Sequence, residues 1–317
     1  MFDRRSLLSA TPALLLAACS GGSAPGRKVR IGFQRDGVLL LAQSNGWLEK
    51  ELKAVGVQSV EYVLFPSGPP LLEAMRAGAV DFGSTGETPP IFAQAGGSSL
   101  VYAAAQPVTG AGQALITPDG SPIRKVADLR GKTLAFTPGS SAHLFALEAL
   151  RGAGLTLADV NVAPLSPPDA SAAFARGALD GWIIWDSYLA LAERDLKARR
   201  VIDGNALPPT STFFLAARSF AEGSPTVLSA LLSKLSLVAR QGEADVDRAV
   251  KIIAAASGLS PEIVRISRRR GPMSVTPLTD QIIARQQAVA DVLSEARVIP
   301  RKIQVAEAAW RGWKGDA

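Results

Sequence analysis

Short apolar runs alternate with segments of helical periodicity over the first two thirds of the chain. Residues 28–33 have the composition of a buried strand, and residues 38–56 carry apolar side chains at helical spacing. The same succession recurs as a predicted strand over 132–136 and a predicted helix over 143–155. Strands that alternate with helices are typical of βαβ units, so this pattern predicts an α/β fold with mainly parallel sheets.

The two units are similar to one another when they are displaced by 99 positions. Ser67 then aligns with Ser166, and residues 78–81 (Gly-Ala-Val-Asp) align with residues 177–180 (Gly-Ala-Leu-Asp). In each copy a capping serine precedes prolines in a first helical turn, an amphipathic helix, a glycine and a short strand. This repetition predicts two lobes of similar plan.

Beyond about Phe220 the spacing of apolar residues is helical, and it predicts helices over 225–243, 244–257 and 277–298. Two extended stretches, 101–120 and 211–218, are expected to carry the chain from one lobe to the other and back, as a hinge of two strands. The sequence therefore predicts lobe one from residues 28–110 and 213–317, and lobe two from residues 111–212.

Residues 1–19 have the features of an export signal. Arg4 and Arg5 precede a short apolar run, and residues 16–19 (Leu-Ala-Ala-Cys) match the bacterial lipobox, in which Cys19 is lipidated after cleavage. An ordinary signal peptide with an incidental cysteine is the alternative, and the arginines fit either twin-arginine or general export. Residues 20–27 read as a flexible tether.

Composition narrows the class of protein. The chain has 317 residues, 47% of them hydrophobic and 20% charged, which suffices for folded lobes and argues against global disorder. Cys19 is the only cysteine, so the remainder of the chain folds without disulfides. The formal charge of +6 favours small anions, and no aromatic residues accompany the basic run Arg268–Arg270 as a nucleic-acid site would require. That run is expected to be a solvated helix end.

Four predicted helix starts share one chemistry, because each combines serine, threonine or glycine with proline or alanine in its first turn: FPSGPP, STGETPP, TPGSSA and LSPPDA. Helix N-termini present free N–H groups and the positive end of the helix dipole. Ligands of such folds bind where strands end and helices begin. Capping alone explains any single start. Four at equivalent loops of two lobes predict a site that surrounds a small anion.

The sequence contains little evidence of a catalytic site or a metal site. Ser140, Ser141 and His143 suggest a nucleophile beside a base, but no third group and no nucleophile elbow accompany them. Glu87 and Asp186 occupy matching positions in the two units, and we expect them to accept hydrogen bonds rather than to act as an acid–base pair. One histidine and one cysteine leave no zinc set, and neither a P-loop nor a dinucleotide fingerprint occurs. We expect no enzyme, no metal and no cofactor.

Several segments resemble the aliphatic sulfonate-binding proteins of ABC importers, a group related to the taurine- and nitrate-binding proteins: residues 65–97, 131–150, 165–193, 211–222 and 298–310. The most specific pieces are TGETPP, GSSAH and IWD. The resemblance implies a type II periplasmic binding protein of two α/β lobes joined by a two-strand hinge, and the lipobox at Cys19 adds the expectation of a lipid anchor in the cell envelope. Such a protein captures a sulfonate or similar oxyanion and delivers it to a membrane permease coupled to an ATPase. We expect a monomer.

Carried over residue by residue, the resemblance implies a pocket lined by Gln34, Ser67, Gly68, Glu87, Thr88, Ser140, Ser141, His143, Asp169, Trp182 and Asp186. For Trp182 and Trp185, packing in the core of lobe two is the alternative to an aromatic wall beside the ligand. The chain departs from the family pattern at Asp36, Val38 and Ser187. Asp36 either meets a cationic amine of the ligand or faces solvent. Other ligands left open are taurine, nitrate, a sulfate ester and a thiamine precursor, and the other class of function is a hydrolase or lyase.

Overall fold

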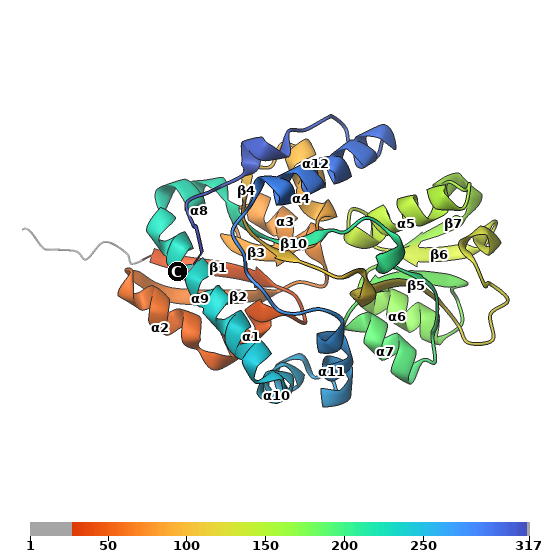
Figure 1. The fold of residues 1–317 in the computed structure, drawn as a ribbon, viewed down its shortest axis with the longest axis horizontal. Coiled ribbons are helices and arrows are strands. Elements are labelled where there is room, and N and C mark those ends of the chain that lie inside the picture. The colour runs from red at the N-terminus through yellow and green to blue at the C-terminus, as the bar shows by residue number, and fades with distance from the viewer. Residues whose placement is uncertain (1–26, 316–317) are drawn as a thin grey trace, which may run out of the picture.

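The computed structural model describes residues 27–315. The predicted signal with Cys19 and the tether up to residue 26 lie outside the described residues. Within residues 27–315 the chain forms two lobes, each built on a five-stranded sheet with helices on both faces (Figure 1). The predicted two-lobed α/β fold is confirmed.

The sheet of lobe one has the order β2-β1-β3-β10-β4, with bounds Val57–Leu64, Arg27–Phe33, Phe82–Thr85, Ser211–Ala217 and Leu100–Pro107. Strand β1 pairs in parallel with β2 and β3, whereas β10 pairs antiparallel with both β3 and β4. Four strands therefore run in one direction, and β10 runs against them because it returns from the other lobe.

The sheet of lobe two has the order β7-β6-β8-β5-β9, with bounds Asn161–Pro164, Thr133–Phe136, Gly181–Trp185, Gln113–Thr117 and Arg199–Asp203. Strand β6 pairs in parallel with β7 and β8, and β5 pairs antiparallel with β8 and β9. Here the single reversed strand is β5, which enters from lobe one. Both sheets are mixed in the same way, because each contains one strand that directly follows a crossing.

Two hydrophobic clusters cover the faces of each sheet. In lobe one, one face carries α1 (Val38–Asn45), α2 (Trp47–Ala54), α9 (Pro225–Ala244), α10 (Val246–Ser257) and α11 (Pro261–Arg270), while the other carries α3 (Gly68–Arg76), α4 (Thr88–Ala95) and α12 (Asp280–Glu295). The short α8 (Arg218–Gly223) follows β10. In lobe two, α5 (Ser141–Gly152) covers one face, and α6 (Pro167–Ala175) and α7 (Tyr188–Asp195) cover the other.

The predicted repetition is visible in the helices. Helices α3 and α6 begin at residues 68 and 167 and end at residues 76 and 175, so both ends are 99 positions apart. Strands β3 and β8 likewise begin 99 positions apart, at residues 82 and 181. The capping differs, however, because Ser166 accepts a hydrogen bond from the Asp169 amide, whereas the Ser67 side chain forms no capping bond. The common plan therefore lies in the hydrophobic pattern and the prolines.

The two crossings differ from the expected pair of strands. The outgoing chain passes through the 3₁₀ turn Gly110–Gly112, and the returning chain passes through the 3₁₀ turn Gly204–Ala206. These turns pack against each other so closely that a Cβ on Gly110 would overlap the Gly204 carbonyl carbon. Residues 211–218 are not the return crossing, since most of them form β10 in the sheet of lobe one.

Helix boundaries shift where a cap intervenes. Residues 38–56 contain two helices rather than one, because Gly46 adopts a positive φ of 61° between α1 and α2. Asp245 caps α10 through the Arg248 amide, so that helix begins at Val246. Thr279 caps α12 in the same way. Helix α11 was not predicted as a separate element, and it lies at the boundary between the lobes (Figure 1).

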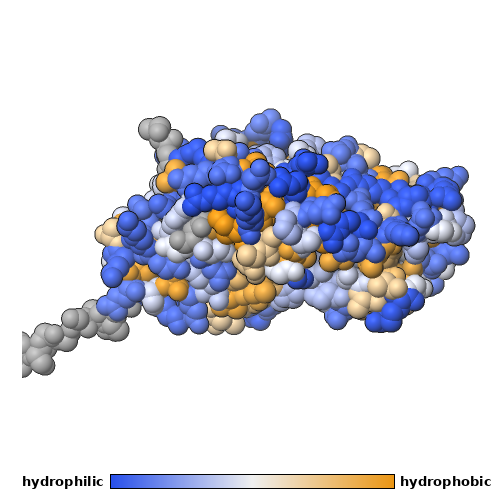
Figure 2. Space-filling view, turned by 90° about the horizontal axis from the view of Figure 1, so that it is seen from below, coloured by the Kyte–Doolittle hydropathy of each residue, from blue (hydrophilic) through white to orange (hydrophobic). Residues whose placement is uncertain are grey.

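One face of the described chain is mainly polar. The face shown in Figure 2 is covered mostly by hydrophilic residues, with smaller groups of hydrophobic residues among them. Between residues 27 and 315 no helix combines the length and apolar character needed to cross a membrane.

Candidate functional site

A cleft of about 990 Å³ separates the two lobes. Its walls come from the loops that follow β1, β3 and β8, from the starts of α3 and α5, from both crossings and from the end of α11. Six predicted site residues line it: Gln34, Gly68, Glu87, Ser140, Ser141 and Asp186. The loops thus meet at the carboxyl ends of the parallel strands, as expected for ligand sites of such folds.

One end of the cleft is closed by a hydrogen bond between the lobes. Ser141, the first residue of α5, donates its hydroxyl to Glu87 Oε2 at 3.0 Å. Glu87 precedes α4 and is only 4% exposed, and its Oε1 accepts the Thr88 hydroxyl at 3.0 Å. Gly86 is needed beside this contact, because a Cβ there would overlap Ser141 Oγ. The starts of α4 and α5 are therefore held together across the cleft.

Burial raises the pKa of the Glu87 carboxyl, although hydrogen bonds from its own backbone and from Thr88 and Ser141 oppose the shift. A raised pKa favours the protonated, neutral carboxyl. In that form Glu87 does not repel an anion near the helix starts.

The start of α5 differs from the other helix starts because it contains no proline. Residues of a first helical turn have N–H groups without intrahelical partners, but proline has no N–H to offer. Prolines occupy the first turns of α3, α4 and α6, whereas Ser141, Ala142 and His143 follow one another at the start of α5. The Ala142 and His143 amides donate to the hydroxyl and the carbonyl of Ser140, so the first turn of α5 offers the amide and the hydroxyl of Ser141 together.

Ser140 has a different role from the one predicted for it. It is the N-cap of α5, accepts a hydrogen bond from the Ala142 amide at 3.2 Å and donates its hydroxyl to the Thr137 carbonyl at 2.6 Å. Its single proton is thus used within the loop. The Ser141 hydroxyl is the one that faces the opposite lobe.

Five predicted site residues do not line the cleft. Ser67 and Thr88 are buried beside it, with exposures of 2% and 0%. Asp169 lies outside it and accepts the Ser166 hydroxyl at 2.6 Å, as part of the cap of α6. His143 and Trp182 are part of the packing described next.

The ring of His143 packs within lobe two and against lobe one. It stacks on Phe136 with a centroid distance of 5.2 Å, lies 5.8 Å from Phe92, and accepts the Gly139 amide at Nδ1. Burial lowers the pKa of the imidazole. Of the two roles considered for His143, packing is therefore the one that this geometry favours over a donor at the rim.

Trp182 belongs to the core of lobe two. It is 1% exposed and contacts Phe174 and Tyr188. Trp185, three residues later on the same strand, lines the cleft. Since alternate residues of a strand face opposite sides, a spacing of three places the two rings on opposite faces.

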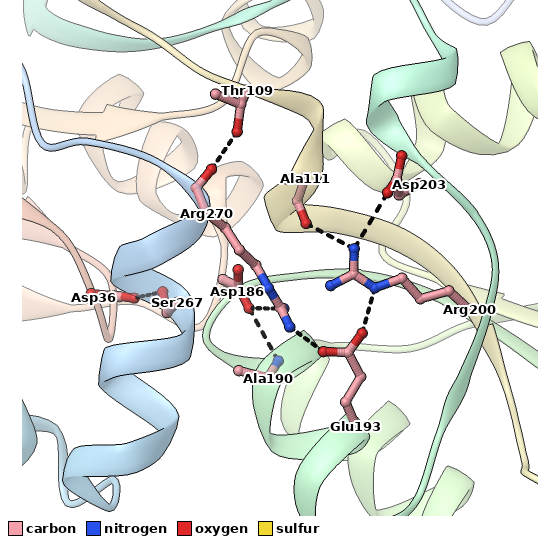
Figure 3. A network of polar contacts seen from close by, with 10 residues as sticks. All are labelled: Asp36, Thr109, Ala111, Asp186, Ala190, Glu193, Arg200, Asp203, Ser267 and Arg270. Carbon is pink, nitrogen blue, oxygen red and sulfur yellow. Dashed lines mark hydrogen bonds and ion pairs between the residues drawn. The ribbon is translucent and has the colours of Figure 1, made fainter.

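A network of charged groups occupies the other end of the cleft (Figure 3). Arg270, at the end of α11 in lobe one, donates to Asp186 Oδ1 at 2.9 Å and pairs with Glu193 on α7 of lobe two. Glu193 also pairs with Arg200, which reaches Asp203 and the Ala111 carbonyl beside the crossings. Arg270 thus joins the two lobes where the crossings meet.

The expectation of a solvated helix end at Arg268–Arg270 is wrong for two of its residues. The side chains of Arg268 and Arg270 are 6% and 14% exposed. Arg268 pairs with Glu243 on α9 and donates to the Gly271 carbonyl at 3.0 Å. Local sequence could not reveal this, because the partners of Arg270 lie 77 and 84 positions away.

Asp186 has an unusual environment. Burial raises its pKa to about 7, against the opposing effect of the Arg270 charge, and the negative charges of Asp36 and Glu193 add to the rise. Its Oδ1 accepts from Arg270 and from the Ala190 amide, whereas Oδ2 is buried without a hydrogen-bond partner. Asp186 therefore lies in the wall of the cleft with one oxygen paired and the other buried.

Comparison with known proteins matches this architecture to one family. A family model described as "ABC transporter, phosphonate, periplasmic substrate-binding protein" covers residues 40–202. The alkanesulfonate-binding protein SsuA from Xanthomonas axonopodis pv. citri, bound to MOPS, is 37% identical, with a TM-score of 0.86 over 91% of this chain and 100% of that one. This chain belongs to the aliphatic sulfonate-binding proteins of ABC importers.

The assignment to the sulfonate-binding family has further support. The periplasmic aliphatic sulphonate binding protein SsuA from Escherichia coli is 36% identical, with a TM-score of 0.80 over 92% of this chain and 94% of that one. The desulfurization enzyme DszB is 15% identical and has a TM-score of 0.65 over 89% of this chain and 96% of its own. At that identity only the fold is shared. The resemblance stated from the sequence is confirmed.

The raised pKa of Asp186 predicts a specific dependence of stability on pH. Between about pH 4 and 7 the folded sulfonate-binding protein holds the Asp186 proton and the unfolded chain does not, so the free energy of unfolding falls as pH rises through this window. A rise from 3.8 to about 7 corresponds to about 4 kcal/mol at most. Asp186→Asn removes this titration.

We therefore expect Asp186→Asn to gain stability relative to the parent as pH rises, and the measurement is chemical denaturation of both at pH values across the window. The difference in stability between parent and variant at low pH serves as the reference, since protonated aspartic acid and asparagine are both neutral there. Parallel curves for parent and variant would show that Asp186 has an ordinary pKa.

Proposed function

We propose that this protein captures an aliphatic sulfonate between its lobes in the cell envelope and delivers it to the permease of an ABC importer. The observation that supports this most strongly is the meeting of helix starts from both lobes at one end of the cleft. A sulfonate has three oxygens and one negative charge, so it needs several donors and little competing negative charge. The first turn of α5 and the Gly68 amide supply donors, and the raised pKa of Glu87 reduces the competing negative charge.

An organic ligand fits the cleft better than nitrate does. Its volume of about 990 Å³ far exceeds what a four-atom anion fills, and Leu144, Phe145 and Trp185 supply apolar walls. The relative from Xanthomonas holds MOPS, a sulfonate with a bulky ring. Taurine, sulfate esters and thiamine precursors are the alternative ligands, and the first two can be compared directly with an alkanesulfonate.

Binding is favoured over hydrolysis or lyase chemistry by the hydrogen bonds of the candidate catalytic groups. The Ser140 hydroxyl donates to a backbone carbonyl, and His143 Nδ1 accepts a backbone amide. A nucleophile would need its proton to go to a base. On this proposal the protein binds and releases the sulfonate without changing it. The permease recognises the state in which the lobes have closed on the ligand.

Calorimetric titration with 1-butanesulfonate, taurine, nitrate and a sulfate ester tests this function. We expect 1-butanesulfonate to bind with stoichiometry one and to be recovered intact by mass spectrometry. Ser141→Ala should weaken that binding about tenfold, because it removes one charge-assisted donor.

Ser99→Ala is the matched control, since Ser99 is exposed outside the cleft, and its affinity should equal that of the parent. Conversion of the sulfonate to a product would contradict a binding function and indicate an enzyme. Equal affinities of the parent and Ser141→Ala would remove Ser141 from the site.

We further propose that the protein is exported and anchored by a lipid on Cys19, which matches the lipobox position in the sequence. A lipid anchor keeps a monomeric binding protein close to its permease and needs no membrane-spanning helix.

In cells that express the full chain, Cys19 should carry the mass of a lipid and the protein should fractionate with membranes. Cys19→Ala should appear in the soluble envelope fraction with unchanged sulfonate affinity. A parent protein that is already soluble after export, with an unmodified cysteine or a cleavage site beyond it, would contradict the anchor.

A further inference from the structure

The charged network beside the crossings has more carboxylates than cations (Figure 3). Four carboxylates contribute, Asp36, Asp186, Glu193 and Asp203, against the two guanidinium groups of Arg200 and Arg270. The two arginines are shared among three of these acids, because Arg270 pairs with Asp186 and Glu193 while Arg200 pairs with Glu193 and Asp203. Asp36 and Asp186 line the cleft itself, and Asp36 is the one of the four that neither arginine reaches.

Asp36 has only neutral donors. Its Oδ1 accepts the Gly37 amide at 2.6 Å, and its Oδ2 accepts the Ser267 hydroxyl at 2.7 Å. The nearest arginines along the chain and on α11 are engaged elsewhere, because Arg35 donates to the Ser257 carbonyl and Arg268 pairs with Glu243. These two bonds orient the Asp36 carboxylate without cancelling its charge.

Asp186 adds negative charge to the same part of the cleft. Its side chain is 10% exposed and pairs with Arg270 through Oδ1, while Oδ2 is buried. The charge of Asp36 acts on Asp186 strongly enough to contribute to its raised pKa, so the two carboxylates lie in one electrostatic environment.

We propose that the ligand of this protein is a zwitterionic sulfonate, whose cationic nitrogen is bound by Asp36 while its sulfonate lies at the helix starts. The proposal rests on the proposed function and specifies the class of sulfonate. An ammonium group supplies N–H donors and the positive charge that Asp36 lacks, at the end of the cleft where carboxylates outnumber guanidinium groups. A bare metal ion is a poorer fit, because no group of three or more potential ligands meets within residues 27–315.

A pair of ligands of the same shape tests the proposal. 3-Aminopropanesulfonate and 1-butanesulfonate differ only in an ammonium group against a methyl group at the end of one chain. At about pH 8, where the amine and the carboxylates are charged, we expect calorimetry to show the zwitterion binding at least about tenfold more tightly. For Asp36→Asn the ratio of the two affinities should fall to about one.

Asp119→Asn is the control, since Asp119 is exposed in a loop of lobe two, and it should keep the parent ratio. Equal affinities of both ligands for the parent overturn the zwitterion proposal while leaving the sulfonate function intact. Failure of both ligands to bind contradicts the proposed function itself. A preference that survives Asp36→Asn overturns the assignment of the cation to Asp36, and the comparison on the parent decides the ligand class even if the variant does not fold.

Discussion

An anion leaves water only where donors replace nearly all of its hydration, and this requirement governs the architecture of the whole molecule. Neither lobe supplies enough donors, because prolines remove amides from the first turns of α3, α4 and α6. The amide and hydroxyl of Ser141, at the start of α5, belong to lobe two, while Gly68 and Glu87 belong to lobe one. We therefore propose that the site is complete only when the lobes are close together, which links binding to closure.

Two of the polar contacts between the lobes differ in character. The hydrogen bond from Ser141 to Glu87 joins two helix starts and is part-buried, while the Arg270 network is charged and includes acids in excess of its bases. Burying such a network gains little net free energy, because desolvation offsets the attraction between the charges. These two contacts alone therefore hold the lobes together only weakly. A ligand that adds donors at one end and positive charge at the other stabilises the closed arrangement at both.

The sequence allowed the lobes and most helices to be predicted, because their determinants are local. Capping serines, prolines and hydrophobic spacing lie within one element, and the displacement of 99 positions recurs in α3 and α6. The site was harder to predict where a role depends on orientation. Ser140 and Ser141 are two adjacent serines that the sequence does not distinguish. In the structure, Ser140 is the N-cap and its hydroxyl donates within its own loop, whereas the Ser141 hydroxyl faces the cleft. Trp182 and Trp185 differ only in the face of β8 that they occupy.

Contacts between distant segments could not be predicted from one chain. In the sequence, Arg270 is the end of a basic helix, and its role depends on α7, which the fold brings to α11.

The central claim, that helix starts of both lobes hold the sulfonate, is tested most directly by a crystal structure with bound 1-butanesulfonate. We expect the sulfonate oxygens to lie within hydrogen-bond distance of Ser141 and of first-turn amides from lobe one. A sulfonate bound instead to Arg270, with the first turn of α5 uncontacted, would contradict it.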